Sequence, residues 1–173
     1  MNSVVAYGLA IGLFLTAAPV AAQNAVPVGL LTDVCLPYAS RAQSFEKSIR
    51  AARDLEFRRP VNDTAPLEEW ASEIVMVSKD GVWRVEIGEG TIEDGERAVY
   101  EARCVISSSR ASARELANLG RRAFNDRSYW TSPADNPWRW DRRSAYPEEY
   151  GLAVEVSEQP GERPTMTVRG SYY

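Results

Sequence analysis

The chain of 173 residues contains no histidine. Without an imidazole, the Ser-His-Asp and Cys-His arrangements that move protons at neutral pH are excluded. The same absence excludes histidine-based zinc, copper and non-haem iron sites, and it leaves only oxygen-donor sites for hard cations. Chemistry carried by paired carboxylates, by a Ser-Lys pair or by a tyrosine stays open.

Several common functional motifs are also missing. The sequence has no phosphate loop, no dinucleotide fingerprint, no calcium-loop spacing and no Gly-x-Ser-x-Gly nucleophile elbow. We therefore expect no cofactor and no bound metal, and an enzyme becomes the less favoured class of function. The net charge of −4 argues against nucleic acid as a partner.

Long apolar runs are scarce, and the clearest one lies at the N-terminus. Residues 1–22 carry no charged side chain and include the apolar stretch Leu9–Thr16, which is shorter than the roughly 20 residues of a membrane-spanning helix. Val20 and Ala22 stand at the −3 and −1 positions of a signal-peptidase site. We expect a signal peptide over 1–22 and a periplasmic or secreted domain over 23–173 without a transmembrane span. An uncleaved N-terminal anchor is the alternative, because the first residues lack a lysine or arginine.

Cysteine is rare, with only Cys35 and Cys104 in the chain. In an oxidising compartment an even pair of cysteines favours a disulfide. Closing a loop of about 70 residues stabilises a fold by about 4 kcal/mol in the chain-entropy model. A redox or metal-binding pair is the weaker alternative, since the two cysteines have no Cys-x-x-Cys spacing.

Two segments have the periodicity of amphipathic helices. Ser40 and Gln43 have the spacing of a capping box, and the apolar residues that follow predict a helix over 41–57 that stops before Pro60. Cys35 would lie just ahead of this helix. A second helix is expected to begin after Ser109, with a narrow stripe of small and apolar residues: Ala113, Leu116, Ala117, Gly120 and Phe124.

Three consecutive segments have the alternation of β-strands. Residues 74–77 and 82–87 flank Lys79-Asp80-Gly81, and Asp-Gly between two β-rich runs indicates a hairpin. Residues 98–106 follow after another turn, with Tyr100, Ala102, Cys104 and Ile106 on one face by the period of two. These segments predict an antiparallel meander whose Cys104 points toward the first helix.

A second hairpin is predicted near the C-terminus. Leu152, Val154 and Val156 precede a Gln-Pro-Gly turn, and Met166 and Val168 alternate with polar residues after it. Together with the meander, these segments predict a two-layer α+β domain. Its antiparallel sheet has about five strands, a meander plus a C-terminal hairpin, with two helices on one face.

Charge is distributed unevenly along the chain. Residues 61–101 hold eleven acidic side chains and three basic ones, whereas residues 110–143 hold eight arginines and four acidic side chains. Two interpretations follow: the arginine-rich part attracts an anionic ligand, or the two parts lie together in the fold and neutralise one another. We favour the second, because charges at alternating strand positions usually lie on solvated faces.

The segment YWTSPADNPWRWDRR, residues 129–143, contains three of the five tryptophans. Its prolines exclude a continuous helix or a central strand. One interpretation is a lid whose indoles cover the end of the sheet, with arginines facing solvent. The other is a recognition surface, because Trp, Tyr and Arg are enriched at binding hot spots. Its candidate binding residues are Trp130, Trp138, Arg139, Trp140, Arg142 and Arg143.

Two hypotheses for function follow from these features. The first, which we favour, is a small exported, disulfide-stabilised module that binds a protein or glycan partner in the cell envelope without catalysis. Cell-wall glycan, lipopolysaccharide and an acidic protein are the candidate ligands, since indoles stack on sugars and arginines pair with carboxylate or phosphate. The alternative is a carboxylate-dependent hydrolase of an envelope polymer, with Asp135 and Asp141 as candidates. It requires two acidic groups about 5 to 10 Å apart in a cleft. The sequence does not determine the oligomeric state.

Overall fold

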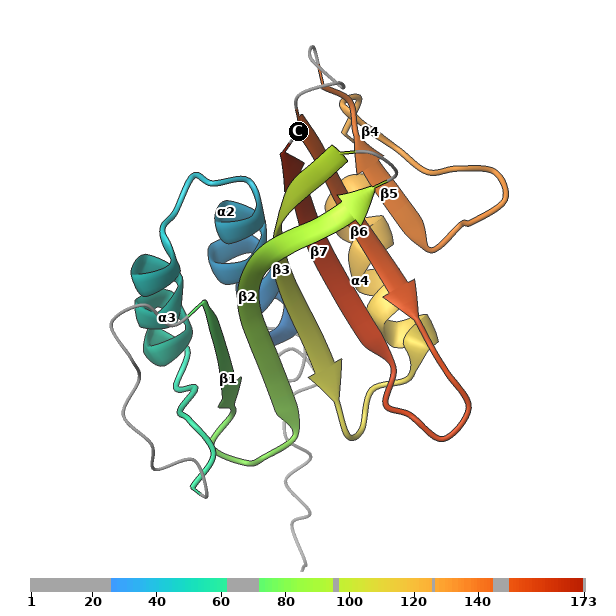
Figure 1. The fold of residues 1–173 in the computed structure, drawn as a ribbon. Helices are drawn as coiled ribbons and strands as arrows, with labels where there is room; N and C mark the ends of the chain where they lie inside the picture. Colours follow the sequence, from blue (N-terminus) through green and yellow to red (C-terminus); the bar gives the residue numbers. More distant parts are fainter. Residues whose placement is uncertain (1–25, 62–71, 95–96, 126, 145–149, 173) are drawn as a thin grey trace, which may run out of the picture.

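Seven strands form a single antiparallel sheet in the computed structural model of the chain (Figure 1). The structure describes residues 26–61, 72–94, 97–125, 127–144 and 150–172. The predicted signal peptide lies outside the described residues.

The sheet has the strand order β1-β2-β3-β7-β6-β5-β4. Both predicted hairpins are present, and β7 pairs with β3, so that the C-terminal hairpin continues the meander. The predicted α+β class is confirmed, but seven strands replace the expected five because residues 129–143 supply two short ones. The strands are β1 (Glu73–Val77), β2 (Trp83–Asp94), β3 (Arg97–Ser108), β4 (Trp130–Thr131), β5 (Arg139–Arg142), β6 (Tyr150–Ser157) and β7 (Thr165–Tyr172).

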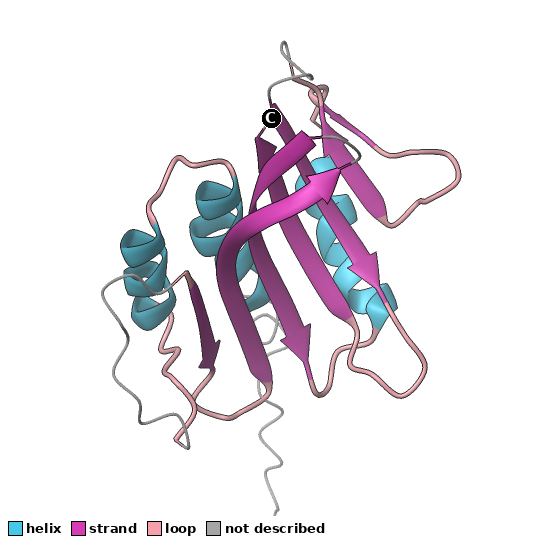
Figure 2. Cartoon of the chain, in the orientation of Figure 1, coloured by secondary structure: helices cyan, strands magenta, loops and turns pink. Residues whose placement is uncertain are grey.

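The helices cover one face of this sheet (Figure 2). They are the π-helical turn η1 (Leu30–Cys35), which continues into α2 (Leu36–Ala39), then α3 (Phe45–Asp54) and α4 (Ala113–Phe124). The continuous η1–α2 segment was not predicted, and with it the described residues contain three helical segments where two were expected. Cys35 therefore lies inside a helical segment and not in the connection ahead of one.

The first predicted helix begins four residues later than expected. Arg41 has a φ of 56°, in the left-handed region, and this conformation separates α2 from α3. The helix is capped by Ser44, whose hydroxyl accepts a hydrogen bond from the backbone N–H of Lys47, and not by Ser40. The sequence contains two serines with capping potential, and the tertiary position of α2 decides between them.

The second predicted helix shows the same kind of shift. Ser112, and not Ser109, caps α4: its hydroxyl accepts from the backbone N–H of Glu115, and the Glu115 carboxylate accepts from the backbone N–H of Ser112. The predicted apolar stripe is confirmed, since all five of its residues are buried.

The predicted disulfide between Cys35 and Cys104 is present in the structure. Both cysteines are completely buried, and the bond joins η1 to the centre of β3. Ala102 and Ile106 are buried on the same face as Cys104, and Val85 and Ile87 are buried on β2. The period of two therefore identified the face of the sheet that the helices cover.

Gly170 on β7 allows α2 to lie directly against the sheet. A Cβ atom at this position would overlap the backbone carbonyl of Ala39, the last residue of α2. The same carbonyl accepts a hydrogen bond of 2.6 Å from the hydroxyl of Tyr172. The contact between α2 and β7 is therefore made by backbone, which leaves no space for a side chain.

Replacing Gly170 with alanine is expected to lower the free energy of unfolding by about 3 kcal/mol, the upper part of the range for overpacking. The physical reason is that the added methyl group meets backbone, which yields less readily than a flexible side chain. Urea unfolding followed by circular dichroism measures the change. Gly151→Ala on β6 is the matched control, because its Cβ would approach the Ser171 Cβ only to 4.0 Å, an ordinary contact. Equal losses in both variants would contradict the assignment.

Candidate functional site

The second face of the sheet carries no helix of the described chain (Figure 1). Alternate residues of the strands project from it, and we call this surface the open face. Most of these side chains are half-buried or exposed polar and charged residues, with a few small apolar ones between them. The residues that define it are Glu73, Val75, Arg84, Glu86, Gly88, Glu101, Arg103, Val105, Arg139, Asp141, Ala153, Glu155, Thr165, Thr167, Arg169 and Ser171.

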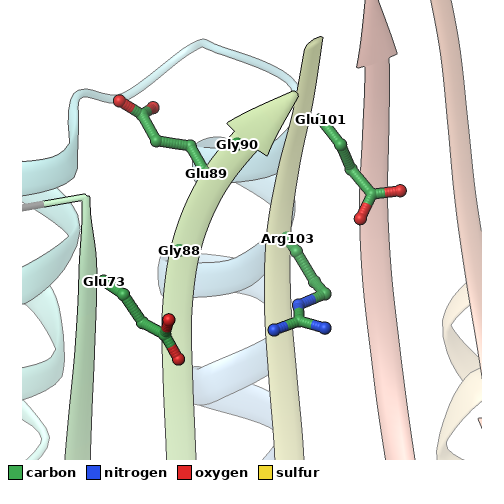
Figure 3. A pocket seen from close by; sticks show the side chains of 6 residues that line it. All are labelled: Glu73, Gly88, Glu89, Gly90, Glu101 and Arg103. Carbon is green, nitrogen blue, oxygen red and sulfur yellow. The ribbon is translucent and has the colours of Figure 1, made fainter. Parts of the chain in front are cut away.

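A hollow of about 220 Å³ lies on this face where β2 carries two glycines (Figure 3). Gly88 and Gly90 have no side chains, so the space above β2 stays open between Glu73 on β1 and Arg103 on β3. Figure 3 shows the Glu89 side chain turned away from Glu73, and its carboxylate accepts a hydrogen bond of 3.4 Å from the Tyr38 hydroxyl of α2. Carboxylate groups and one guanidinium group therefore line the hollow.

A second hollow, of about 350 Å³, lies at the other end of β2 and β3. Val105 supplies an apolar wall, and the turn between β6 and β7 contributes charged residues at its edge. The lining residues are Arg84, Glu86, Val105, Ser107, Glu162, Arg163 and Thr165. Glu86 lines this hollow and also contacts Arg103 of the first one, so the two hollows are neighbours on one surface.

Ion pairs on the open face join neighbouring positions of the sheet. The Glu86 carboxylate lies 3.1 Å from Arg103 and 3.5 Å from Arg84, and all three side chains are partly exposed. Arg139 pairs with Asp141 on the same strand at 2.9 Å. Exposed pairs of this kind contribute about 0–1 kcal/mol each. None of these pairs of described residues links residues 61–101 with residues 110–143, so the expected neutralisation of the two charged segments is not carried by ion pairs among them.

The tryptophans of the aromatic segment point toward the helices. Trp140 on β5 is 1% exposed, and its ring lies so close to α4 that a Cβ at Gly120 would be 2.5 Å from it. Its indole N–H donates a hydrogen bond of 2.9 Å to the Asn125 side chain. Trp130 on β4 is half-buried, and its ring centroid lies 4.4 Å from that of Phe124. A completely buried indole offers no surface to a ligand, so Trp140 acts in packing.

The arginines of the same segment do not share one surface. Arg139 projects from the open face, where its Nε donates to both oxygens of Asp141 at 2.9 and 3.1 Å. Arg142 is exposed at the edge of the sheet, with its guanidinium 5.7 Å from the centre of the Tyr129 ring. Arg143 is exposed, and Trp138 is half-buried against the core. The six predicted binding residues are thus divided between the core, the edge and the open face.

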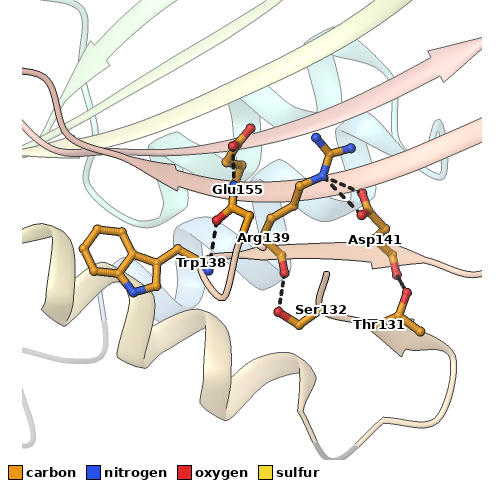
Figure 4. A network of polar contacts seen from close by, with 7 residues as sticks. Thr131, Ser132, Trp138, Arg139, Asp141 and Glu155 are labelled. Carbon is orange, nitrogen blue, oxygen red and sulfur yellow. Dashed lines mark hydrogen bonds and ion pairs between the residues drawn. The ribbon is translucent and has the colours of Figure 1, made fainter. Parts of the chain in front are cut away.

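Polar contacts hold the proline-containing turn of this segment against β6 (Figure 4). The Asn136 side chain donates to Glu155 at 2.9 Å and accepts from the backbone N–H of Trp138 at 3.2 Å. Ser132 donates to the Arg139 carbonyl at 2.8 Å. These bonds explain how a segment broken by prolines is ordered as two short edge strands.

The two carboxylates that the hydrolase hypothesis names have different surroundings. Asp141 is held by Arg139, and Asp135 is exposed in the turn before β5. A general acid at neutral pH needs a raised carboxyl pKa. Among the described carboxyl groups, every resolved pKa shift is downward, and its main cause is hydrogen bonding to the carboxylate. The groups with a lowered pKa are Glu46, Asp80 and Glu115.

A cluster of tyrosines around Arg41 was missed in the sequence because its members are far apart in the chain. The Arg41 guanidinium lies 4.3 Å from the centre of the Tyr100 ring and 4.2 Å from that of Tyr172, a cation–π arrangement with both. Burial raises the pKa values of the Tyr38 and Tyr172 hydroxyls, which therefore stay neutral. This cluster fastens the turn between α2 and α3 to the end of the sheet.

Comparisons with protein-family models, with curated proteins and with solved structures found no match. Within the described part of the chain, no helix has both the length and the apolar character needed to cross a membrane. The same residues contain no group of three or more potential His, Cys, Asp or Glu metal ligands. The assignment of a function therefore depends on the geometry of the open face.

Proposed function

We propose that the chain is an exported, disulfide-stabilised module without catalytic activity, and that its open face binds a partner in the cell envelope. The observation that carries this proposal is the pair of adjacent hollows on a sheet face that no described helix covers. An uncovered face alone would be ordinary, because antiparallel sheets often have one solvated side. Two neighbouring hollows lined by arginine, carboxylate and small residues give that side a shape that a partner can recognise.

The composition of the open face supports a binding role. Val75, Val105 and Ala153 are half-buried apolar residues among charged neighbours, which resembles the mixture found in non-obligate interfaces. Arginines and carboxylates are both present on this face, and such a mixture selects partners by complementary charge. The disulfide supports export, because stable disulfides form mainly in oxidising compartments.

The proposal predicts that a photoreactive benzoylphenylalanine at Val105 forms cross-linked adducts in the native envelope fraction. The residue lies in the second hollow, so a bound partner is within reach of its side chain. Immunoblotting against the chain measures the adducts, and N-terminal sequencing of the mature protein tests whether it begins near Gln23. The control carries the same photoreactive residue at Arg114, which is exposed on α4. Adducts at both positions, or none at Val105, would contradict recognition by the open face.

A further inference from the structure

Two arginines lie directly opposite each other near the centre of the open face. Arg103 on β3 is the register partner of Arg169 on β7, and residues in such antiparallel positions have Cα atoms about 4.5 to 5.5 Å apart. We propose that this pair binds a phosphate group of the ligand. This inference rests on the proposed function and names the chemistry of the ligand that the open face binds.

The first argument is the charge of the pair. Like charges in directly opposite positions destabilise a sheet. An anion bound between the two guanidinium groups would remove this repulsion and so stabilise the sheet. The Arg103 side chain contacts Glu86, which also contacts Arg84, whereas the Arg169 side chain is exposed and makes no ion pair or hydrogen bond with the described residues.

The second argument is the space around the pair. Gly88 is the register partner of Arg103 on β2, and Ala153 is that of Arg169 on β6, so both flanks carry small residues. On the Gly88 side this space is the first hollow, which has Arg103 in its wall together with Glu73, Glu89 and Glu101. An anion placed between the guanidinium groups therefore has a glycine and an alanine at the two flanking register positions, with Glu73 beyond the glycine.

The third argument is the supply of further donors. Thr167 and Ser171 stand two positions before and after Arg169 on the same face of β7. Their hydroxyl groups add two donors to the guanidinium forks, and a tetrahedral phosphate has acceptor oxygens for all of them. A carboxylate has only two oxygens and one charge, so it uses this set of donors less completely.

Acidic side chains also stand close to the arginine pair, and Glu73 faces Arg103 across Gly88 in the first hollow. Glu155 is a hydrogen-bond acceptor for Asn136, which holds it toward the edge of the sheet. Glu101 precedes Arg103 by two positions on the same face and lines the first hollow. Its carboxylate would repel a bound phosphate. A variant without this charge should therefore change phosphate affinity in the direction opposite to the arginine variants. Neutralising Glu101 should strengthen binding, whereas removing either arginine should weaken it.

The test is a calorimetric titration of the mature protein with inorganic phosphate. Arg103→Ala and Arg169→Ala are each expected to weaken binding by about tenfold, as the loss of one charge-assisted contact. Arg169→Lys should fall between the wild type and the alanine variant, because lysine keeps the charge without the bidentate fork. Glu101→Gln should bind more tightly. Arg114→Ala on α4 is the control with the same change of charge, and it should leave binding unchanged.

A second readout separates binding from folding. Arg169→Ala removes a like-charge contact, so its urea unfolding midpoint should equal or exceed that of the wild type while phosphate binding falls. Unchanged binding in the Arg103→Ala/Arg169→Ala double variant, or an equal loss in Arg114→Ala, would overturn the site. If the double variant still cross-links a partner through Val105, only the phosphate inference fails. If phosphate binds but no adduct forms at Val105, the proposed binding of a macromolecular partner is contradicted and the phosphate site is retained.

The source of the phosphate is decided by a flotation assay. Phosphatidylcholine vesicles with and without phosphatidic acid are mixed with the wild type and the double variant. Binding that requires both phosphatidic acid and the arginine pair assigns a lipid headgroup. Phosphate binding in solution without vesicle binding assigns a free or soluble phosphate compound, and loss of both overturns the inference.

Discussion

Replacing Trp140 with alanine is expected to lower the free energy of unfolding by about 3–5 kcal/mol, the range for truncating a buried tryptophan. Trp140 is almost completely buried, and its ring fills the space beside Gly120 and lies 5.7 Å from the centre of Phe124. Gly120 on α4, which lies against this ring, has no side chain that could fill the cavity. The loss also leaves the Asn125 side chain without the indole donor.

Urea unfolding followed by far-ultraviolet circular dichroism measures this loss. Trp138→Ala is the matched control in the same segment, and it should lower the free energy of unfolding clearly less, because Trp138 is only half-buried just before β5. Acrylamide quenching provides an independent check, since the most shielded component of the fluorescence should disappear with Trp140. A larger loss from Trp138→Ala than from Trp140→Ala would show that the two indoles are placed the other way round.

Removing the disulfide by Cys35→Ala and Cys104→Ala is expected to destabilise the fold by about 4 kcal/mol, as the chain-entropy model gives for a loop of this length. The bond closes a separation of 69 residues and ties the η1–α2 segment to the middle of the sheet. Without it, that segment is held by buried apolar side chains such as Leu30 and Leu31 and by the contact between Ala39 and Gly170.

Thermal unfolding with and without dithiothreitol measures the contribution of the disulfide. The wild type should lose stability in the reductant, whereas the double variant should unfold at the same lower temperature in both conditions. Equal midpoints for the oxidised wild type and the double variant would mean that packing alone holds the segment. Reduction breaks the covalent bond but leaves both sulfur atoms in place, whereas the double variant also removes the sulfur atoms. Comparing the two therefore separates the contribution of the bond to stability from that of packing by the sulfur atoms.

Local patterns in the sequence were sufficient for most of the elements. Alternation predicted the two hairpins and the buried face of β3, and the stripe from Ala113 to Phe124 predicted α4. These predictions hold because the period of a strand or helix is a property of consecutive residues. The predicted caps Ser40 and Ser109 were wrong: Ser44 and Ser112 cap the two helices, because several residues near each start have side chains that can accept the capping hydrogen bond.

The η1–α2 segment and the strands β4 and β5 could not be predicted in the same way. The helical segment is short, and η1 has no side-chain cap, so its burial against the sheet determines its conformation. The strands β4 and β5 contain few residues and are separated by a connection with two prolines. They exist because β5 pairs with β6 and β4 pairs with β5, and because Asn136 and Ser132 fix the connection.

The sequence by itself determined that a histidine-free chain with one pair of cysteines folds as an α+β protein with antiparallel hairpins. Only the tertiary structure decided that Trp140 belongs to the core, that Arg139 lies on the open face, and that Arg103 meets Arg169. The physical reason is that the periodic pattern of apolar residues is a property of consecutive residues, so it predicts the individual helices and strands. The pairing of β3 with β7 is set instead by the combined burial of residues distant in sequence, and a shift of one residue in that pairing would move every side chain to the other face.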